Sequence, residues 1–334
     1  MDEIFELDDS LSIPKYLQLV KVIGTWINAG VYKCGDKLPS INELSAEFDV
    51  ARDTVDKAFA DLKERGVVSS TKGKGFYVTK NSVKNKIFVG LFFNRMTSYN
   101  EAIYYVLYNN LKEFAFVDLM IYHNSVDILE EQIARYSKAY DYFVVIPTVH
   151  NEEGMMEALS KLPKQKVLII KRVLNEFKGR FAAVYQDFYS DMMQALNSVH
   201  AEISRYDTLK LIYRPEKYSS EILRGFISFC RINQIDYAVE EAVQEVRRGE
   251  AYIILDDNDM MNLIQRQQEA DYKLGEEIGI ISYEDSPVKS LLSGGITAIR
   301  LNNQQIGELT AEMILSNNLQ KIRIPFSLIK RKSL

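Results

Sequence analysis

The chain has 334 residues, and its net charge of −5 excludes a general electrostatic attraction to nucleic acid or to anionic membranes. Hydrophobic residues make up 47%, as in proteins that bury sizeable cores, and the length predicts two or three domains. Two cysteines and three scattered histidines support neither a disulfide framework nor a metal site. The first ten residues carry five acids and no Lys or Arg, and no apolar run approaches ~18 residues. We therefore expect a cytoplasmic protein without a membrane partner.

Charge and hydrophobic pattern change near residue 80. Residues 10–80 hold 11 Lys and Arg against 8 Asp and Glu, and residues 63–86 hold seven basic residues against one acid. A small basic module therefore precedes a larger acidic one. The polar stretch 79–86 lacks apolar periodicity and is predicted to link a module at 1–78 to one at 87–334.

The small module is predicted to contain three helices. The first has apolar residues at i, i+3 and i+4 spacing and stops at Gly30. Ser40 and Glu43 form a capping box that starts a second helix over about residues 41–48. A tight turn leads into a third helix over about residues 52–65. Two helices joined by a short turn are typical of helix-turn-helix proteins, whose second helix enters the major groove of DNA.

A two-stranded hairpin is predicted after the third helix, with Lys72-Gly73-Lys74-Gly75 at its tip. Its lysines supply charge for phosphates or for a minor groove. By charge alone, the basic hairpin is equally explained as solvated surface. What favours DNA binding is the whole order of elements, which ends in this glycine- and lysine-rich wing.

Short motifs stand in a fixed order through this module: P-x-Y-x-Q (14–18), G-x-Y-x-x-G-D-K-L-P-S (30–40), N-E-L (42–44), V-A-R-D-T-V (50–55), A-x-x-x-L (58–62), G-V-V (66–68) and G-K-G-F-Y-V (73–78). Over about 70 residues they closely resemble the winged helix-turn-helix of the gluconate-operon repressor (GntR) family. The resemblance implies that Arg52 and Thr54 contact DNA and that Lys72-Gly73 form the wing tip. The residues predicted to lie at DNA are Ser40, Asn42, Ala51, Arg52, Asp53, Thr54, Lys57, Lys72, Gly73 and Lys74.

Three positions depart from that family's pattern. The family often has Arg where this chain has Asn42 and Asp56, and Ser or Thr where it has Ala51. Fewer basic groups imply fewer phosphate contacts and a shifted base preference. Arg52 can bond the O6 and N7 atoms of guanine. Asn42 and Asp53 either contact bases or support the helix.

Beyond residue 86, short apolar runs alternate with amphipathic stretches, which predicts parallel sheets covered by helices on both faces. Ten runs exceed one ordinary sheet of ~5–6 strands, so we expect two α/β lobes. Ligands in such folds bind outside the carboxyl ends of the strands, here in a crevice between the lobes. The runs are 86–94, 117–124, 140–147, 166–172, 180–187, 208–214, 251–257, 277–283, 295–302 and 322–329.

The large module resembles the sugar-sensing core of the lac-repressor family, which is similar to periplasmic binding proteins. The resemblance spans nearly all of 86–334 and is carried by the segments 224–239, 254–261, 278–287, 296–315 and 324–334. It implies two lobes joined by three strand crossings, with a small molecule closing the cleft. We expect lobe 1 at about 87–187 and 288–318, and lobe 2 at about 188–287 and 319–334.

Polar residues at or near the predicted strand ends are expected to bind the effector. Carboxylates accept hydrogen bonds from paired hydroxyls, while Arg and Asn bridge ring and hydroxyl oxygens, so this set suits a sugar. Aromatic residues such as Phe93, Tyr99 and Tyr283 would cover an apolar sugar face. For each charged residue, a solvated loop or an interlobe ion pair is the alternative. The predicted effector-binding residues are Asn94, Lys171, Asp187, Arg214, Glu221, Arg224, Asp257 and Glu284.

The large module departs at one position from the pattern of the lac-repressor family. Sugar-sensing relatives usually carry Arg three residues before the Gly of the R-x-x-G-F segment, but this chain has Ile222 there. Either Arg214 or Glu221 replaces that Arg, or the ligand differs in chemistry. Arg224 lies two steps further along the helix and is expected to point elsewhere.

The predicted fold class is an α+β winged helix-turn-helix head followed by a two-lobed α/β periplasmic-binding-protein-like (type I) sensor domain. The predicted function is a homodimeric repressor that binds a palindromic double-stranded DNA operator and is released by a small effector, with a monosaccharide, such as the deoxy-sugar fucose, as the best candidate. The alternatives are a DNA-binding head fused to a catalytic domain and a solute-binding protein. No catalytic motif is present in the sequence, so no enzyme activity, catalytic residue or cofactor is predicted.

Overall fold

The computed structural model describes residues 7–9, 11, 13–148, 151–172 and 181–334. Their contacts divide the chain into two compact units, which are described separately. The first unit comprises residues up to Leu91 together with Leu111–Met120 and Glu131–Phe143, and the second comprises Phe92–Asn110, Ile121–Glu130 and Val144–Leu334. Within the described part of the chain, no helix is long and apolar enough to cross a membrane.

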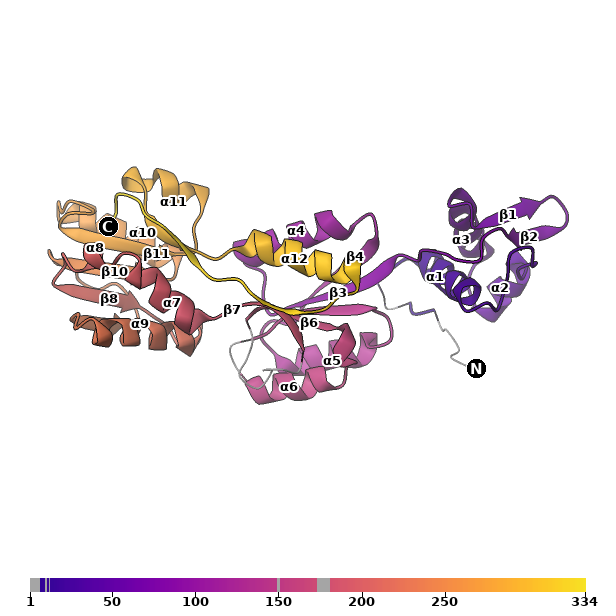
Figure 1. Ribbon diagram of the computed structural model, residues 1–334, viewed down its shortest axis with the longest axis horizontal. Helices are drawn as coiled ribbons and strands as arrows, with labels where there is room; N and C mark the ends of the chain where they lie inside the picture. Colours follow the sequence, from indigo (N-terminus) through magenta and orange to yellow (C-terminus); the bar gives the residue numbers. More distant parts are fainter. Residues whose placement is uncertain (1–6, 10, 12, 149–150, 173–180) are drawn as a thin grey trace. The chain divides into compact units, whose positions relative to one another are not determined.

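The head is a three-helix module with a two-stranded wing (Figure 1). Strands β1 and β2 pair antiparallel, with Val68 opposite Val78. The predicted order of helix, capped helix, turn, helix and hairpin is thus confirmed. The elements are α1 (Lys15–Asn28), α2 (Ile41–Glu47), α3 (Arg52–Glu64), β1 (Val68–Thr71) and β2 (Gly75–Val78).

The fold of the head is determined by local sequence signals and by one small apolar core. The Ser40 hydroxyl accepts a hydrogen bond from the amide of Glu43, whose carboxylate accepts one from the Ser40 amide at 2.7 Å, so the predicted capping box is present. Helix α3 is tied to the wing by Phe59, which is 1% exposed and stacks on Phe76 with ring centroids 3.8 Å apart. The recognition helix and the wing therefore share one apolar core.

The remaining described chain is built around two six-stranded sheets (Figure 1). The first has the order β13-β7-β6-β5-β3-β4, with β3 (Ile87–Phe93), β4 (Ala115–Ile121), β5 (Tyr142–Ile146), β6 (Val167–Arg172), β7 (Ala182–Gln186) and β13 (Lys321–Arg323). The second has the order β14-β12-β11-β10-β8-β9, with β8 (Thr208–Ile212), β9 (Tyr237–Glu240), β10 (Glu250–Ile254), β11 (Ile278–Tyr283), β12 (Thr297–Arg300) and β14 (Ser327–Ile329). Pairs such as β6 with β7 and β10 with β11 are parallel, whereas β14 runs antiparallel to β12.

Each sheet with its helices forms one lobe. In the first lobe, α12 packs on β6 and β7 beside α4 (Figure 1). In the second, α7 and α9 pack together and α10 contacts β10. The first-lobe helices are α4 (Ser98–Leu111), α5 (Val126–Tyr136), α6 (Glu152–Ser160) and α12 (Asn303–Ser316), and those of the second lobe are α7 (Phe188–Asn197), α8 (His200–Ile203), α9 (Ser220–Ile232), α10 (Asp257–Glu269) and α11 (Pro287–Leu291).

The chain passes between the lobes three times, after β7, after β12 and after β13, as the resemblance implied. The expected assignment of 288–318 to lobe 1 needs a correction, because β12 pairs with β11 in the second sheet. Likewise β13 pairs with β7 in the first sheet, although 319–334 was assigned to lobe 2. Helix α12 does belong to the first lobe.

The run 322–329 is not the single strand that its apolar pattern predicted. It forms β13 and β14, which lie in different sheets. Pro325 lies between them, and because proline has no amide hydrogen it cannot continue a ladder. The preceding residue, Ile324, donates its amide to the carbonyl of Tyr185 at 2.7 Å, which ends the pairing with β7.

Candidate functional site

The start of α3 presents an exposed polar face. Arg52, Asp53 and Lys57 are exposed, and Asp53 lies 4.0 Å from Lys57, one helical turn away. Thr54 is half-buried, and Ala51 is the N-cap without a side-chain bond. Because the apolar side of α3 is held in the core, this face is available to a groove of DNA.

The wing and the start of α2 hold the remaining residues predicted to lie at DNA. Lys72, Gly73 and Lys74 are exposed at the hairpin tip, where Gly73 has φ of +76°, a conformation that glycine adopts without strain. Asn42 is exposed on α2. The Ser40 side chain is engaged in the capping box, so its position starts a helix whatever else it contacts.

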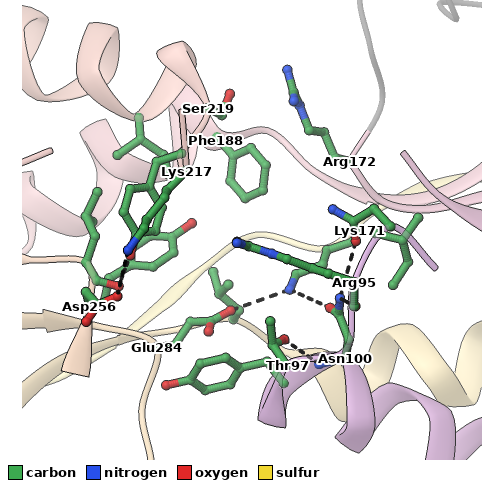
Figure 2. Close-up of a pocket in the computed structure, with 18 of the residues that line it drawn as sticks. Arg95, Thr97, Asn100, Lys171, Arg172, Phe188, Lys217, Ser219, Asp256 and Glu284 are labelled. Atoms are coloured by element: carbon green, nitrogen blue, oxygen red, sulfur yellow. Dashed lines mark hydrogen bonds and ion pairs between the residues drawn. The ribbon is translucent and has the colours of Figure 1, made fainter. Parts of the chain in front are cut away.

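A cavity of about 360 Å³ lies in the second unit, at the carboxyl ends of strands from both sheets (Figure 2). This volume is within the range of small-molecule sites. The structure brings together four predicted effector-binding residues in its lining: Asn94, Lys171, Asp257 and Glu284. Tyr99 and Tyr283 also line it, whereas Phe93 is fully buried in β3 and does not.

The other four predicted effector residues lie outside the described lining, and each has another contact. Asp187 is the N-cap of α7 and accepts hydrogen bonds from Ser190. The side chain of Arg214 forms an ion pair with Asp259. Arg224 lies 5.5 Å from the ring centre of Tyr189, and Glu221 is partly buried on α9. The proposed site therefore does not include these four residues.

Two lining residues hold strained backbone conformations and face each other across the cavity. Lys171 has φ of +73° and Glu284 has φ of +61°, in the left-handed region that costs a non-glycine residue ~1–3 kcal/mol. The Lys171 ammonium lies 3.6 Å from the Glu284 carboxylate and 3.0 Å from the amide oxygen of Asn100. Strain of this kind is typical of binding sites, because the surrounding fold holds the side chains ready.

Glu284 is 8% exposed. Burial raises the pKa of its carboxyl, and the nearby ammonium groups of Lys171 and Lys289 only partly oppose that shift. Burial also raises the pKa of the Tyr283 phenol well above its usual range. Its hydroxyl is buried and has no hydrogen-bond partner among the described residues.

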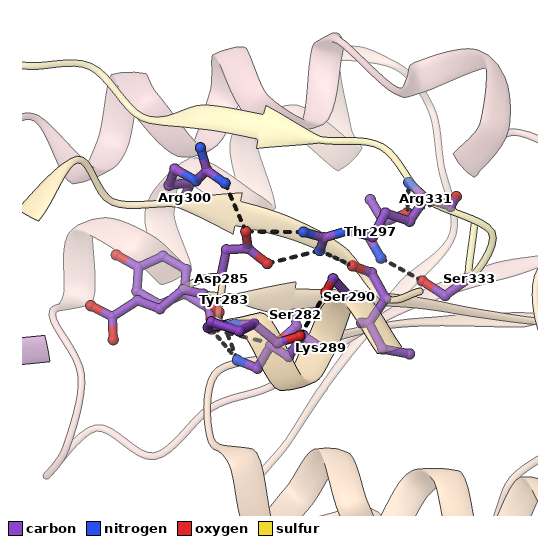
Figure 3. Close-up of polar contacts among 12 residues, drawn as sticks. Ser282, Tyr283, Asp285, Lys289, Ser290, Thr297, Arg300, Arg331 and Ser333 are labelled. Carbon is purple, nitrogen blue, oxygen red and sulfur yellow. Dashed lines mark hydrogen bonds and ion pairs between the residues drawn. The ribbon is translucent and has the colours of Figure 1, made fainter. Parts of the chain in front are cut away.

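A buried lysine stabilises the part of the cavity lining that holds Tyr283 and Glu284 (Figure 3). The Lys289 side chain is 2% exposed, and its ammonium donates to the carbonyls of Tyr283 and Glu284 at 3.2 and 2.6 Å. It also lies 2.7 Å from the Asp257 carboxylate. Lys289 therefore ties the loop after β11 to the start of α10, the two segments that supply the carboxylates.

The C-terminal residues brace the same loop (Figure 3). Asp285 accepts two hydrogen bonds from Arg331, at 2.8 and 3.0 Å, and one from Arg300 at 3.0 Å. Burial alone would raise the pKa of Asp285, but these hydrogen bonds outweigh it and the pKa is lowered. Ser333 bonds to the Thr297 amide and to the carbonyl of Ile280. The last residues of the chain are therefore part of the fold.

Some lining residues were not predicted. Arg95 directly follows the predicted Asn94, and Arg172 follows Lys171 at the end of β6, so their positions beside strand ends were a usable signal. Asp256 likewise directly precedes the predicted Asp257. Lys217, which lies 3.9 Å from Asp256, comes from a second-lobe loop that apolar periodicity does not locate. Within the described residues, no group of three His, Cys, Asp or Glu side chains is arranged to hold a metal ion.

Comparison with known proteins finds relatives for both the head and the two-lobed domain. Residues 15–78 match the model of the gntR family of bacterial regulatory proteins, and residues 204–334 match that of a periplasmic-binding-protein-like domain. The chain is 32% identical over 79 residues to the HTH-type transcriptional repressor YtrA of Bacillus subtilis (strain 168), which covers 24% of this chain and 61% of that protein. It is 33% identical over 76 residues to the arabinose metabolism transcriptional repressor of Geobacillus stearothermophilus, 23% of this chain and 21% of that one.

The chain thus spans less than two thirds of the length of these curated relatives. Among solved structures, it resembles a LacI family transcriptional regulator from Enterococcus faecalis V583 with bound ribose, with a TM-score of 0.58 and 19% identity over 74% of this chain and 98% of that one. All three proteins are transcriptional regulators, and the last comparison shows the fold alone. This chain therefore carries a gntR-type winged helix-turn-helix head followed by a two-lobed domain with a periplasmic-binding-protein-like fold.

Proposed function

We propose that this protein is a cytoplasmic, sugar-responsive transcription repressor. A homodimer binds a palindromic operator through two heads and releases it when a small sugar occupies the cavity. The observation that carries the proposal is that one chain holds both an exposed recognition helix with a basic wing and a cavity of hydrogen-bonding and aromatic side chains. The effector class is supported by two similar proteins, a repressor of arabinose metabolism and a regulator whose structure holds ribose.

In the head, the proposed recognition set is the exposed start of α3 together with the wing tip. Arg52 is exposed at the first position of α3, where recognition helices contact base edges. Lys72 and Lys74 supply the charge for phosphates. The head is small, so two copies are needed for a selective complex, and a two-fold dimer imposes a palindromic site.

The proposed dimer surface is the exposed face of α4, a helix of the first lobe. Two of its tyrosines are exposed although aromatic, Tyr105 at 53% and Tyr108 at 41%. Tyr104 contacts both rings, so the three form one aromatic strip along the helix. Such a strip is typical of a surface that a partner covers.

In the cavity, Asp257 and Glu284 are proposed to accept hydrogen bonds from sugar hydroxyls, with Asn94 and Lys171 facing ring and hydroxyl oxygens. Tyr99 is placed to cover an apolar sugar face. A monosaccharide is the proposed effector, and the deoxy-sugar fucose is the first candidate because of the aromatic lining.

The test begins with DNA. The full chain is used to select binding sequences from a random double-stranded library, and affinity is measured by fluorescence anisotropy at several salt concentrations. A palindromic consensus, bound by a dimer in analytical ultracentrifugation, is the expected result. Binding that lacks any sequence preference would contradict the proposal.

Effector action is tested on the same DNA. Monosaccharides that raise the melting temperature of the protein are titrated into the complex, since a ligand of the native state stabilises it. Coupling of ~1–3 kcal/mol is expected between the two sites, and it must be reciprocal: DNA weakens sugar binding by the factor by which sugar weakens DNA binding. A sugar that binds without changing DNA affinity would refute the regulatory role.

A further inference from the structure

The charges that line the cavity are unevenly neutralised. Among the described residues, three carboxylates line it, and each has a lysine partner: Asp256 lies 3.9 Å from Lys217, Glu284 lies 3.6 Å from Lys171, and Asp257 lies 2.7 Å from Lys289. Two arginines, Arg95 and Arg172, also line it. Among the described residues, neither has an ion pair with a lining carboxylate.

Arg172 is buried with part of its hydrogen-bonding capacity unused. Its side chain is 10% exposed, and Nη2 lies 3.2 Å from the carboxylate of Glu152, which is outside the lining. The Nε and Nη1 atoms are buried and have no hydrogen-bond partner among the described residues. Glu221 and Glu152 also act on Arg172 electrostatically, but burial outweighs both and lowers the pKa of its guanidinium. A buried guanidinium in this state is costly unless a further acceptor binds it.

Arg95 adds a second cation on the same side. It is exposed, and Figure 2 shows its side chain extended across the cavity from the first-lobe wall. No ion pair of Arg95 occurs in the part of the chain that the structure describes. Its charge acts on the hydroxyl of Tyr218, a lining residue of the second lobe. The first-lobe part of the lining thus contains two guanidinium groups and the amides of Asn94 and Asn100.

The second lobe lacks the cation that the resemblance implied. Ile222 stands where sugar-sensing relatives carry Arg, and it is 3% exposed in the lining. The guanidinium groups of this cavity therefore come from the first lobe, a different wall from the one expected.

We propose that the effector is an acidic sugar, which carries a phosphate or carboxylate group bound by Arg95 and Arg172 on the first-lobe wall. Its hydroxyls face Asp257 and Glu284. Planar guanidinium groups bind both oxyanions with paired hydrogen bonds, so they do not by themselves separate phosphate from carboxylate. This inference rests on the proposed function and replaces the neutral monosaccharide with a charged one.

The first experiment uses inorganic phosphate, which requires no knowledge of the sugar. The melting temperature of the full chain is measured with phosphate and with chloride at equal ionic strength, for the wild type, Arg95→Gln, Arg172→Gln and the control Arg135→Gln. Arg135 is an exposed first-lobe residue outside the lining, so its variant makes the same change in charge. The phosphate-dependent rise is expected in the wild type and the control and is lost in both cavity variants. An equal rise in all four proteins would overturn the proposal, because it would reflect general salt effects.

The second experiment separates the two sources of negative charge. Calorimetric titration compares glucose, galactose and arabinose with their phosphates and with the corresponding uronates. At least one acidic member is expected to bind roughly tenfold or more tightly than its neutral parent, and Arg95→Gln, which changes only an exposed side chain, is expected to remove that difference. Neutral sugars that bind as tightly as every acidic derivative would overturn the inference. In that case release of DNA by a neutral sugar would still uphold the proposed function.

Discussion

The start of α3 and the cavity wall around Glu284 use charge in opposite ways. Arg52 and Lys57 are exposed on a helix whose apolar side fixes it in the head. Glu284 and Lys289 are buried, and each is held by an ion pair with a distant segment of the chain, Glu284 with Lys171 and Lys289 with Asp257. The first surface is hydrated until a partner covers it, whereas the second is already desolvated and paired.

This difference teaches where substitutions should act. An exposed side chain such as Arg52 contributes to binding without contributing to folding, so its loss should reduce DNA affinity alone. A buried charge such as Lys289 cannot be removed without leaving polar groups unsatisfied, so its loss should reduce stability first. Each prediction below therefore measures the free energy of unfolding and a binding property together.

The largest effect is expected for Lys289→Met. The variant leaves the carbonyls of Tyr283 and Glu284 without their donor and Asp257 without its ammonium partner. We expect a loss of about 3 kcal/mol in the free energy of unfolding, measured by urea denaturation. A matched control is Lys273→Met, which changes an exposed lysine of the same lobe. An equal free energy of unfolding in the two variants would contradict the proposed difference between buried and exposed charges.

Asp285→Asn should cost about 2 kcal/mol near neutral pH, between the values for exposed and buried ion pairs, because Arg331 and Arg300 lose their common partner. The pKa of Asp285 is lowered in the fold, so its contribution is present above the unfolded pKa of about 3.9 and is lost as the pH falls further. The difference in stability between wild type and variant should therefore shrink below pH ~4. Urea denaturation as a function of pH measures this, and a constant difference would contradict it.

Arg52→Ala is expected to leave stability unchanged and to weaken binding to the selected DNA about tenfold, within the ~1–3 kcal/mol of a bidentate guanine contact. Discrimination at one base position should relax with it. Arg266→Ala, at an exposed residue of α10, serves as the control. Unchanged affinity would remove Arg52 from the recognition set.

The smallest effect is expected for Lys57→Gln. Lys57 is 67% exposed and lies one turn beyond Asp53 on α3. If it contacts a phosphate, affinity falls slightly for all DNA sequences, and the slope of log affinity against log salt drops by about 1. Anisotropy titrations at four salt concentrations measure that slope. A sequence-dependent loss would instead place Lys57 at a base.

The head was more predictable than the cavity for a physical reason. Its elements depend on local chemistry: the capping box at Ser40, the apolar spacing of the helices and the glycines of the wing. Four predicted effector residues meet in the cavity because carboxyl ends of parallel strands share one edge. Asp187 and Arg214 also lie near strand ends, but they are turned into a helix cap and an ion pair, which spacing along a chain does not reveal.

By itself the sequence determined the order of helices and strands, the winged head and the presence of two α/β lobes, because these depend on periodicity, caps and turns over a few residues. Only the tertiary structure decided that 322–329 divides between two sheets, that Lys289 is buried behind the cavity wall and that Arg95 and Arg172 lack lining carboxylates. Those facts depend on which segments, far apart in the sequence, come into contact. Only such tertiary contacts decide which charged groups are buried and which are paired, and these properties govern the chemistry of the ligand site.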